Sequence, residues 1–184
     1  MSTTVPVKKS VLFVCLGNIC RSPMAEIVFR ALVAERDLLD HWHIDSAGTS
    51  AYHIGEAPDE RSVETCSTLM SSTVSKKAHD HFKSLKLHRA RQLVTEDFST
   101  FDYIFAMDGN NLTNIKRLNE RSHHQKHGFP SKSVIKRIGE YHPEERYLNV
   151  EDPYYGDMSG FKVNYQQLLI SCTRFLDEVQ SSSS

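Results

Sequence analysis

Apolar residues follow two patterns along this chain: short continuous runs, and longer stretches in which they recur with helical spacing. Continuous runs rich in β-branched and aromatic residues occur at 11–15 and 103–107. Runs of this kind predict strands that are buried on both faces, as in a parallel sheet. Weaker runs at 43–46 and 133–138 predict two further strands.

Helical spacing occupies the stretches between and after these runs. Apolar residues recur every three or four positions within 24–32, 58–70 and 112–118, and most clearly within 161–179. Strands that alternate with helices predict an α/β fold, because a helical crossover commonly connects parallel strands. We expect a three-layer sandwich of flavodoxin-like or Rossmann-like type, with a central four-stranded parallel sheet flanked by helices.

The length of 184 residues predicts a single domain, with a core from about 10 to 179 and frayed ends at 1–7 and 181–184. Lysine and arginine number 22 against 23 aspartates and glutamates, for a net charge of −1. This balance disfavours a globally basic nucleic-acid binder. No apolar run approaches the roughly 18 residues that span a bilayer, so we expect no stable membrane insertion.

Two further features bear on the compartment. A basic pair before the first apolar run imitates a signal peptide, but no small-residue cleavage pattern follows, which favours a buried strand. The cysteines, Cys15, Cys20, Cys66 and Cys172, lack the paired spacing of zinc ribbons and are too few for a disulfide scaffold. We therefore expect a reducing, cytoplasmic location, with Cys66 and Cys172 as core thiols on helix faces.

The chemistry concentrates in the segment Cys15-Leu16-Gly17-Asn18-Ile19-Cys20-Arg21-Ser22, which joins the first predicted strand to the first predicted helix. Loops at the carboxyl ends of parallel strands bind ligands, and the N–H groups that open a helix attract anions. Gly17 and Asn18 both tolerate the positive φ that lets such a loop turn its amides inward, so we expect an anion-binding nest. The nucleotide-binding pattern GxxxxGK[ST] is absent, which disfavours a kinase or ATPase.

This nest predicts a nucleophile. Inward-facing amides stabilise a thiolate at Cys15, and the planar guanidinium of Arg21 can hold two phosphoryl oxygens at once. The hydroxyl of Ser22 belongs to the same segment and can donate to the sulfur. The spacing C-x5-R alone occurs by chance, and a cysteine that ends a buried strand is usually core. The strand, loop and helix around Cys15 favour a phosphate site instead.

A thiolate that displaces a phenoxide from phosphorus needs an acid from elsewhere in the chain. Asp152 is the best candidate, because Pro153 keeps it out of helical geometry and the loop around it is rich in aromatic and turn residues. Asp-Pro alone is more often an ordinary turn. The rings of Tyr154 and Tyr155 favour the functional interpretation, since they can wall a slot deep enough for an aryl phosphate.

Together these segments resemble the low-molecular-weight protein tyrosine phosphatases from about Ser10 to Val179. The match comprises the family's phosphate-loop signature and its later segments in the same order, at 11–30, 44–46, 101–104, 107–108 and 152–156. The resemblance implies one phosphatase domain that hydrolyses phosphotyrosine and aryl phosphate monoesters through a cysteinyl-phosphate intermediate. It implies no cofactor.

The resemblance also assigns roles to individual residues. It implies that Cys15 is the nucleophile, Arg21 the phosphate clamp and Asp152 the general acid. The substrate-binding residues that it implies are Leu16, Gly17, Asn18, Ile19, Cys20, Ser22, Tyr52 and Tyr154, and the supporting residues are Ser46, His88, Asp108 and Tyr155. Within these sets, Asn18, Ser22, Ser46 and His88 form the network that holds the loop, and Asp108 is the partner of Arg21. The resemblance further favours a redox role for Cys20, as a thiol that forms a disulfide with oxidised Cys15.

The chain departs from the family in a longer, basic connection at about 71–88. This connection carries four lysines against the single Asp80. A solvated surface is the favoured interpretation, and electrostatic guidance of acidic peptides or anionic membranes is the weaker alternative.

Ten histidines raise the hypothesis of a metal site, above all at 79–81 and 123–127. No cysteine or paired carboxylate accompanies them at ligand spacing, so solvated loops are favoured and no metal is expected.

Two other functions stay open beside the phosphatase. Arsenate reduction on the same scaffold needs further cysteines as a relay, and Cys66 and Cys172 form no obvious one. A non-catalytic phosphotyrosine-binding module has no use for Cys15 and Asp152. The sequence favours the phosphatase, with phosphotyrosine proteins or peptides and small aryl phosphates as substrates and inorganic phosphate as a product.

Overall fold

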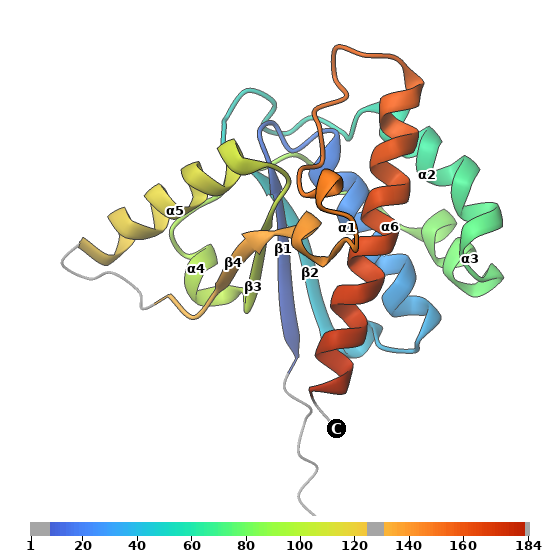
Figure 1. Ribbon diagram of the computed structural model, residues 1–184, viewed down its shortest axis with the longest axis horizontal. Helices are drawn as coiled ribbons and strands as arrows, with labels where there is room; N and C mark the ends of the chain where they lie inside the picture. The colour runs from blue at the N-terminus through green and yellow to red at the C-terminus, as the bar shows by residue number, and fades with distance from the viewer. Residues whose placement is uncertain (1–7, 125–130, 183–184) are drawn as a thin grey trace, which may run out of the picture.

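A parallel β-sheet forms the middle layer of the computed structural model, which describes residues 8–124 and 131–182 (Figure 1). The sheet has four strands in the order β2-β1-β3-β4, and every neighbouring pair is parallel. The strands are β1 (Lys9–Cys15), β2 (Trp42–Gly48), β3 (Tyr103–Ala106) and β4 (Val134–Arg137). This topology confirms the predicted four-stranded α/β fold.

The main helices cover both faces of this sheet (Figure 1). One side carries α1 (Arg21–Glu35), α2 (Glu60–Thr73), α3 (Lys76–Ser84) and α6 (Met158–Ser181). The other carries α4 (Asp97–Thr100) and α5 (Gly109–His124). Short 3₁₀ turns complete the chain at η1 (Leu39–His41), η2 (Ile138–Tyr141) and η3 (Glu145–Tyr147). None of the described helices is long and apolar enough to cross a membrane.

Strand β1 lies in the middle of the sheet and is buried on both faces. Val11 and Phe13 belong to the apolar cluster under α1 and α6, whereas Leu12 and Val14 belong to the cluster under α4 and α5. All four side chains are fully buried. Successive side chains of a strand point to opposite faces, so a strand covered on both sides is apolar at every position. This explains the continuous apolar run in the sequence.

Helix α3 is an element that the sequence analysis missed, because it read the connection at 71–88 as a solvated surface. Ser75 caps its first turn by accepting a hydrogen bond from the Ala78 N–H. Ala78 and Phe82 are buried in the same apolar cluster as α1. The connection is therefore a packed helix whose lysines face outward.

The ends of the chain differ slightly from expectation. Helix α6 includes Ser181, although frayed residues were predicted from 181 onward. Residues 1–7 and 183–184 lie outside the described part of the chain, as does part of the histidine segment at 123–127.

The topology places the segments with the candidate active-site residues at one edge of the sheet. In parallel strands all carboxyl ends meet at the same edge of the sheet. The segments that follow β1, β2 and β3 therefore lie together, and the chain returns to this edge when the Val150 N–H donates to the carbonyl of Met107. Residues 151–157 then lead into α6 beside the loop that follows β1.

Candidate active site

The segment 15–22, called the phosphate loop below, joins β1 to α1 with its carbonyls turned outward. Four of its carbonyl oxygens accept hydrogen bonds from surrounding segments: Cys15 from the Thr49 N–H (2.9 Å), Leu16 from the Ser50 N–H (2.9 Å), Ile19 from the Asp59 N–H (2.7 Å) and Cys20 from the Ser62 hydroxyl (3.1 Å). In a trans peptide the N–H points opposite to the carbonyl. The amides therefore turn inward, as an anion-binding nest requires.

Asn18 sets the curvature of this loop. Its φ of 58° lies in the left-handed region. Its side-chain amide donates to the hydroxyls of Ser22 (2.9 Å) and Ser46 (3.0 Å), and its backbone N–H lies 3.3 Å from Sγ of Cys15. Local hydrogen bonds of this kind let asparagine adopt a conformation that most residues avoid.

Gly17 does not have the positive φ that the sequence analysis expected for it, since among the described residues only Asn18, Asp37 and Gly55 have one. Its small size matters for another reason. A Cβ at this position would lie 2.8 Å from Cδ2 of His53, which packs over the loop. Glycine thus lets the His53 ring pack closely over the loop, and a larger residue here would displace that ring.

The thiol of Cys15 lies at the bottom of the loop, almost fully buried. Its sulfur lies 3.0 Å from the hydroxyl oxygen of Ser22. That oxygen already accepts a hydrogen bond from Asn18, so its own proton is available to the sulfur or to the nearby carbonyl of Ala47 (3.3 Å). Together with the Asn18 N–H, the hydroxyl can stabilise negative charge on the sulfur.

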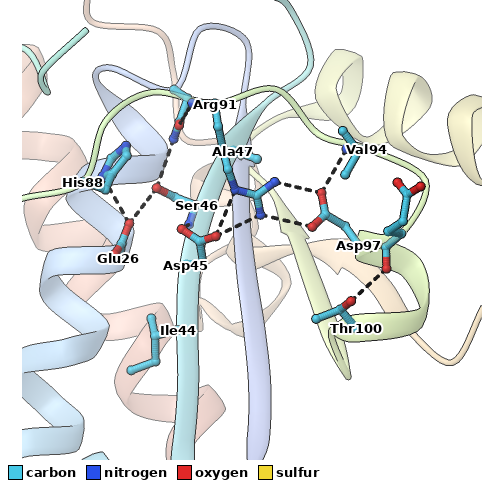
Figure 2. A network of polar contacts seen from close by, with 12 residues as sticks. Glu26, Ile44, Asp45, Ser46, Ala47, His88, Arg91, Val94, Asp97 and Thr100 are labelled. Carbon is cyan, nitrogen blue, oxygen red and sulfur yellow. Dashed lines mark hydrogen bonds and ion pairs between the residues drawn. The ribbon is translucent and has the colours of Figure 1, made fainter. Parts of the chain in front are cut away.

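A buried chain of hydrogen bonds extends this network into β2 and α1 (Figure 2). The Ser46 hydroxyl donates to Oε2 of Glu26 at 2.7 Å, and Nδ1 of His88 lies 3.3 Å from the same oxygen. His88 therefore reaches the phosphate loop through Glu26 and Ser46 rather than directly. Because Ser46 and Glu26 are buried and paired, they help to fix one geometry of the loop.

Arg91 supports the loop from the other side (Figure 2). Its backbone N–H donates to the side-chain oxygen of Asn18 at 3.0 Å. Its guanidinium binds the carboxylates of Asp45 (2.9 Å) and Asp97 (3.0 and 3.1 Å). The amide of Asn18 is thus fully engaged, with both its oxygen and its nitrogen in hydrogen bonds.

Arg21 extends its guanidinium toward the carboxyl-end segments of the fold. Nη1 lies 2.6 Å from Oδ2 of Asp108 and donates to the carbonyl of Val150 at 3.1 Å, while Nη2 lies 3.4 Å from Oδ2 of Asp152. Burial alone would lower the pKa of Arg21. The neighbouring Cys15, Asp108 and Asp152 nevertheless raise this pKa above its ordinary value, so the guanidinium stays charged.

A cavity of about 170 Å³ opens above this group. Its lining consists of Cys15, Leu16, Gly17, Ile19, Cys20, Arg21, Tyr52, His53, Asp152, Tyr154 and Tyr155. The Asp152 side chain is 45% exposed, and the ring centroids of Tyr154 and Tyr155 are 4.9 Å apart. The cavity thus combines a buried thiol and a cation with an exposed carboxylate and aromatic walls.

No group of three or more metal-binding side chains is found within residues 8–124 and 131–182. Cys66 and Cys172 are fully buried free thiols, and burial raises the pKa of each. Neither belongs to the lining of the cavity.

Comparison with known proteins identifies this arrangement. Residues 10–184 match the family model described as low molecular weight phosphotyrosine protein phosphatase. This chain belongs to that family.

Curated relatives and solved structures agree with the assignment. A low molecular weight phosphotyrosine protein phosphatase of Dictyostelium discoideum is 52% identical over 98% of this chain and 99% of its own, and the Homo sapiens protein of the same name is 45% identical over 92% and 95%. A solved protein tyrosine phosphatase from Entamoeba histolytica has a TM-score of 0.75 at 30% identity and covers 96% of this chain and 100% of its own. A Drosophila arginine phosphatase has a TM-score of 0.75 at 35% identity and covers 92% and 96%.

In this member of the phosphatase family, the structure brings the sequence-predicted residues together. The substrate-binding residues line the cavity, except for Asn18 and Ser22, which lie behind the sulfur. Asp108 contacts Arg21, and Ser46 and His88 lie in the buried chain around Glu26. The roles assigned to these residues stay predictions, as does the Cys15–Cys20 disulfide, which peptide mapping after peroxide treatment would detect.

Sequence reasoning missed other residues of this phosphatase site. His53 lines the cavity next to the predicted Tyr52, and Glu26 and Arg91 hold the loop from behind. Arg91 lies outside the short segments that carried the family resemblance, three residues after the predicted His88. Glu26 carried no signal beyond a charged residue in an otherwise apolar helix.

Proposed function

We propose that this phosphatase hydrolyses phosphotyrosine and aryl phosphate monoesters through a cysteinyl-phosphate intermediate. The observation that carries the proposal is the convergence of three groups on one cavity: the buried thiol of Cys15, the charged guanidinium of Arg21 and the exposed carboxyl of Asp152. These are a nucleophile, an anion clamp and an acid, the three functions that transfer of a phosphoryl group to sulfur requires.

In the first step the thiolate of Cys15 attacks phosphorus, and the bond from phosphorus to the phenolic oxygen breaks. Asp152 donates its proton to that oxygen, so the phenol leaves neutral. The inward-facing amides of the loop and Arg21 hold the three equatorial oxygens while negative charge shifts among them.

In the second step Asp152, now a carboxylate, takes a proton from a water molecule whose oxygen attacks phosphorus. The bond from sulfur to phosphorus breaks, and inorganic phosphate is released. The hydroxyl of Ser22, 3.0 Å from the sulfur, stabilises the thiolate that leaves. Each residue returns to its starting protonation state.

The walls of the cavity support an aromatic substrate. Tyr52 and Tyr155 are 78% and 96% exposed, and Tyr154 stands between Tyr155 and His53 with ring centroids 4.9 and 6.4 Å away. Exposed rings at the mouth of a cavity offer stacking surface to a phenyl ring that enters it. Phosphotyrosine in proteins or peptides and small aryl phosphates fit this lining.

The alternatives have less support. Arsenate reduction needs a relay of accessible cysteines, whereas Cys66 and Cys172 are fully buried in the core. A phosphotyrosine-binding module needs neither a thiol at the bottom of the cavity nor an acid in its wall. The free thiols of all four cysteines also fit a cytoplasmic enzyme.

The decisive experiment is turnover of p-nitrophenyl phosphate by the purified protein in the presence of a metal chelator. Hydrolysis that disappears in the Cys15→Ser variant supports the proposal, and an inactive wild-type protein contradicts it. The same assay with a phosphotyrosine peptide and a phosphoarginine peptide tests the substrate class, since one solved relative is named an arginine phosphatase. Faster release of phosphate from the phosphoarginine peptide would show that phosphoarginine, and not phosphotyrosine, is the preferred substrate.

A further inference from the structure

A second hollow of about 480 Å³ lies beside the catalytic cavity. The two share a wall, because Leu16 and Tyr52 line both of them. Leu16 directly follows the nucleophile in the chain, and Tyr52 is largely exposed. A group bound in the second hollow therefore lies beside two residues that also border a substrate in the first.

The far side of this hollow is formed by α5. Asn114, Arg117 and Arg121 line it and lie three and four positions apart, so they share one face of the helix. Both arginines are exposed, and neither forms an ion pair with another residue in the described part of the chain. No aspartate or glutamate belongs to the lining. The hollow thus carries two positive charges without a local counter-charge.

The near side adds hydrogen-bonding groups. Gln92 and Ser50 line the hollow together with Thr49. The hydroxyl oxygen of Thr49 is buried and has no hydrogen-bond partner within the described residues. Because this oxygen is closed off from solvent, a ligand in the hollow contacts Gln92 and Ser50 rather than the Thr49 hydroxyl.

We propose that this hollow binds a carboxylate side chain that flanks the phosphotyrosine of a peptide substrate. The inference rests on the proposed function, because it takes the catalytic cavity as the place where the phosphotyrosine binds. An extended peptide advances about 3.3 Å per residue, so a side chain one or two positions from the phosphotyrosine passes over the wall of Leu16 and Tyr52. Arginine recognises a carboxylate through two parallel N–H groups, which is the chemistry that Arg117 and Arg121 present.

The test compares four substrates: p-nitrophenyl phosphate, a phosphotyrosine peptide with neutral flanks, and two versions of this peptide with glutamate before or after the phosphotyrosine. For the wild-type enzyme we expect a lower KM for the peptide with glutamate on one of the two sides. In the double variant Arg117→Gln and Arg121→Gln, kcat/KM for that peptide should fall about tenfold. The other substrates should change little.

The matched control is Lys116→Gln, which removes an exposed positive charge from another face of the same helix. This variant should leave kcat/KM unchanged for every substrate in the set. The charge-reversed variant, Arg117→Glu with Arg121→Glu, should prefer a peptide with lysine at the preferred position. The proposal is contradicted if glutamate gives no advantage to the wild-type enzyme, or if the double variant and the control lower kcat/KM equally.

A binding measurement separates this proposal from the proposed function. Fluorescence polarisation of the same labelled phosphopeptides on the Cys15→Ser variant needs no turnover. The acidic peptide should bind more tightly than the neutral one, and Arg117→Gln with Arg121→Gln should abolish this preference. That result supports carboxylate binding in the hollow even if wild-type turnover fails. Equal binding of acidic and neutral peptides would contradict the proposed role of the hollow. If p-nitrophenyl phosphate is still turned over, the proposed chemistry is unaffected by that result.

Discussion

The phosphate loop and the acid loop, residues 151–157, both contribute to the catalytic cavity, yet they are held in different ways. In the phosphate loop, the side chains of Asn18, Arg21 and Ser22 are buried and joined to neighbouring elements by several hydrogen bonds. In the acid loop only Pro153 is buried, and the other six residues are exposed. One loop is built into the core, whereas the other lies on its surface.

A few contacts fix the acid loop. Nη1 of Arg61 donates to the carbonyls of Tyr154 (3.0 Å) and Gly156 (3.5 Å), and its guanidinium lies 5.5 Å from the ring centroid of Tyr154. Asp59, which caps α2, holds this guanidinium at 2.8 Å. Because the Asp59 N–H also binds the carbonyl of Ile19, the first turn of α2 touches both loops.

The proposed mechanism gives the two loops different tasks, and this explains the difference. The phosphate loop must present fixed dipoles to a charge that moves, and any reorganisation of those dipoles would weaken their effect. The general acid gives its proton to the leaving group and takes one from the attacking water in the second step, so its carboxyl has to remain accessible. Burial suits the first task and exposure the second. The predictions below test how far this contrast holds.

The largest effect is expected at the nucleophile. Cys15→Ser should lower kcat by at least about 10⁴-fold, because a serine hydroxyl in this nest is a far weaker nucleophile. Binding of inorganic phosphate, measured by isothermal titration calorimetry, should persist since Arg21 and the loop amides remain. Substantial hydrolysis by this variant would rule out the covalent route.

The second effect concerns the acid loop. Asp152→Asn should lower kcat by about 10²- to 10⁴-fold for a poor leaving group such as the phenol of phosphotyrosine. An activated aryl phosphate, whose phenol leaves without protonation, should lose less. Steady-state kinetics over a series of aryl phosphates measure how the loss of kcat depends on the pKa of the leaving phenol. An equal loss across the series would remove Asp152 from the first step.

The fold could be predicted from the sequence because the clearest apolar patterns belong to buried elements. Strand β1 is apolar at every position, and this reflects burial on both faces. Helix α3 was missed because only Ala78 and Phe82 anchor it, and its lysines dominate the local composition. Two apolar residues in a basic stretch do not show helical periodicity clearly. Only the structure shows that α1 packs beneath them.

The site was predictable as far as it followed chain order. The phosphate loop is a continuous segment, and the acid loop was found from an aspartate next to proline and two tyrosines. His53 and Arg61 act through tertiary contacts with Gly17 and Tyr154, which chain order does not reveal, although His53 directly follows the predicted Tyr52. Of the two residues that tolerate a positive φ, Asn18 has one and Gly17 does not, and the small size of Gly17 makes room for His53 instead.

The third effect tests the rigidity of the phosphate loop. Asn18→Ala removes the amide that donates to the hydroxyls of Ser22 and Ser46, and it leaves the Arg91 N–H without its acceptor. A buried group left unpaired costs about 1–3 kcal/mol. We expect kcat to fall by at least about tenfold and Tm to decrease by several degrees. Thermal unfolding and aryl phosphate turnover measure the two changes.

A matched control for this variant is Asn18→Gly. Glycine accepts the left-handed φ of 58° but makes no side-chain hydrogen bonds. If Asn18→Gly restores Tm but not kcat, backbone strain determines stability and the hydrogen bonds determine rate. Full activity in both variants would show that the buried network does not hold the loop.

The smallest effect is expected at Arg61, which supports the exposed loop. Arg61→Gln should lower kcat only by about three- to tenfold, with the loss greatest for poor leaving groups, since it acts by placing Asp152. In the Asp152→Asn background the same substitution should have almost no further effect on kcat. A full additional loss in the double variant would show that Arg61 does not act through Asp152.

The connectivity of Arg21 has a consequence for how activity arises during folding. Its partners Asp108 and Val150 lie 87 and 129 residues away along the chain, and Asp152 lies 131 away. Contacts between such distant segments form only after the entropy of closing long loops has been overcome. The nucleophile is synthesised early and the groups that complete its cavity emerge late. We therefore expect a chain that ends before residue 150 to be inactive, and we expect enzymatic activity to return after the helical circular dichroism signal when the denatured protein is refolded.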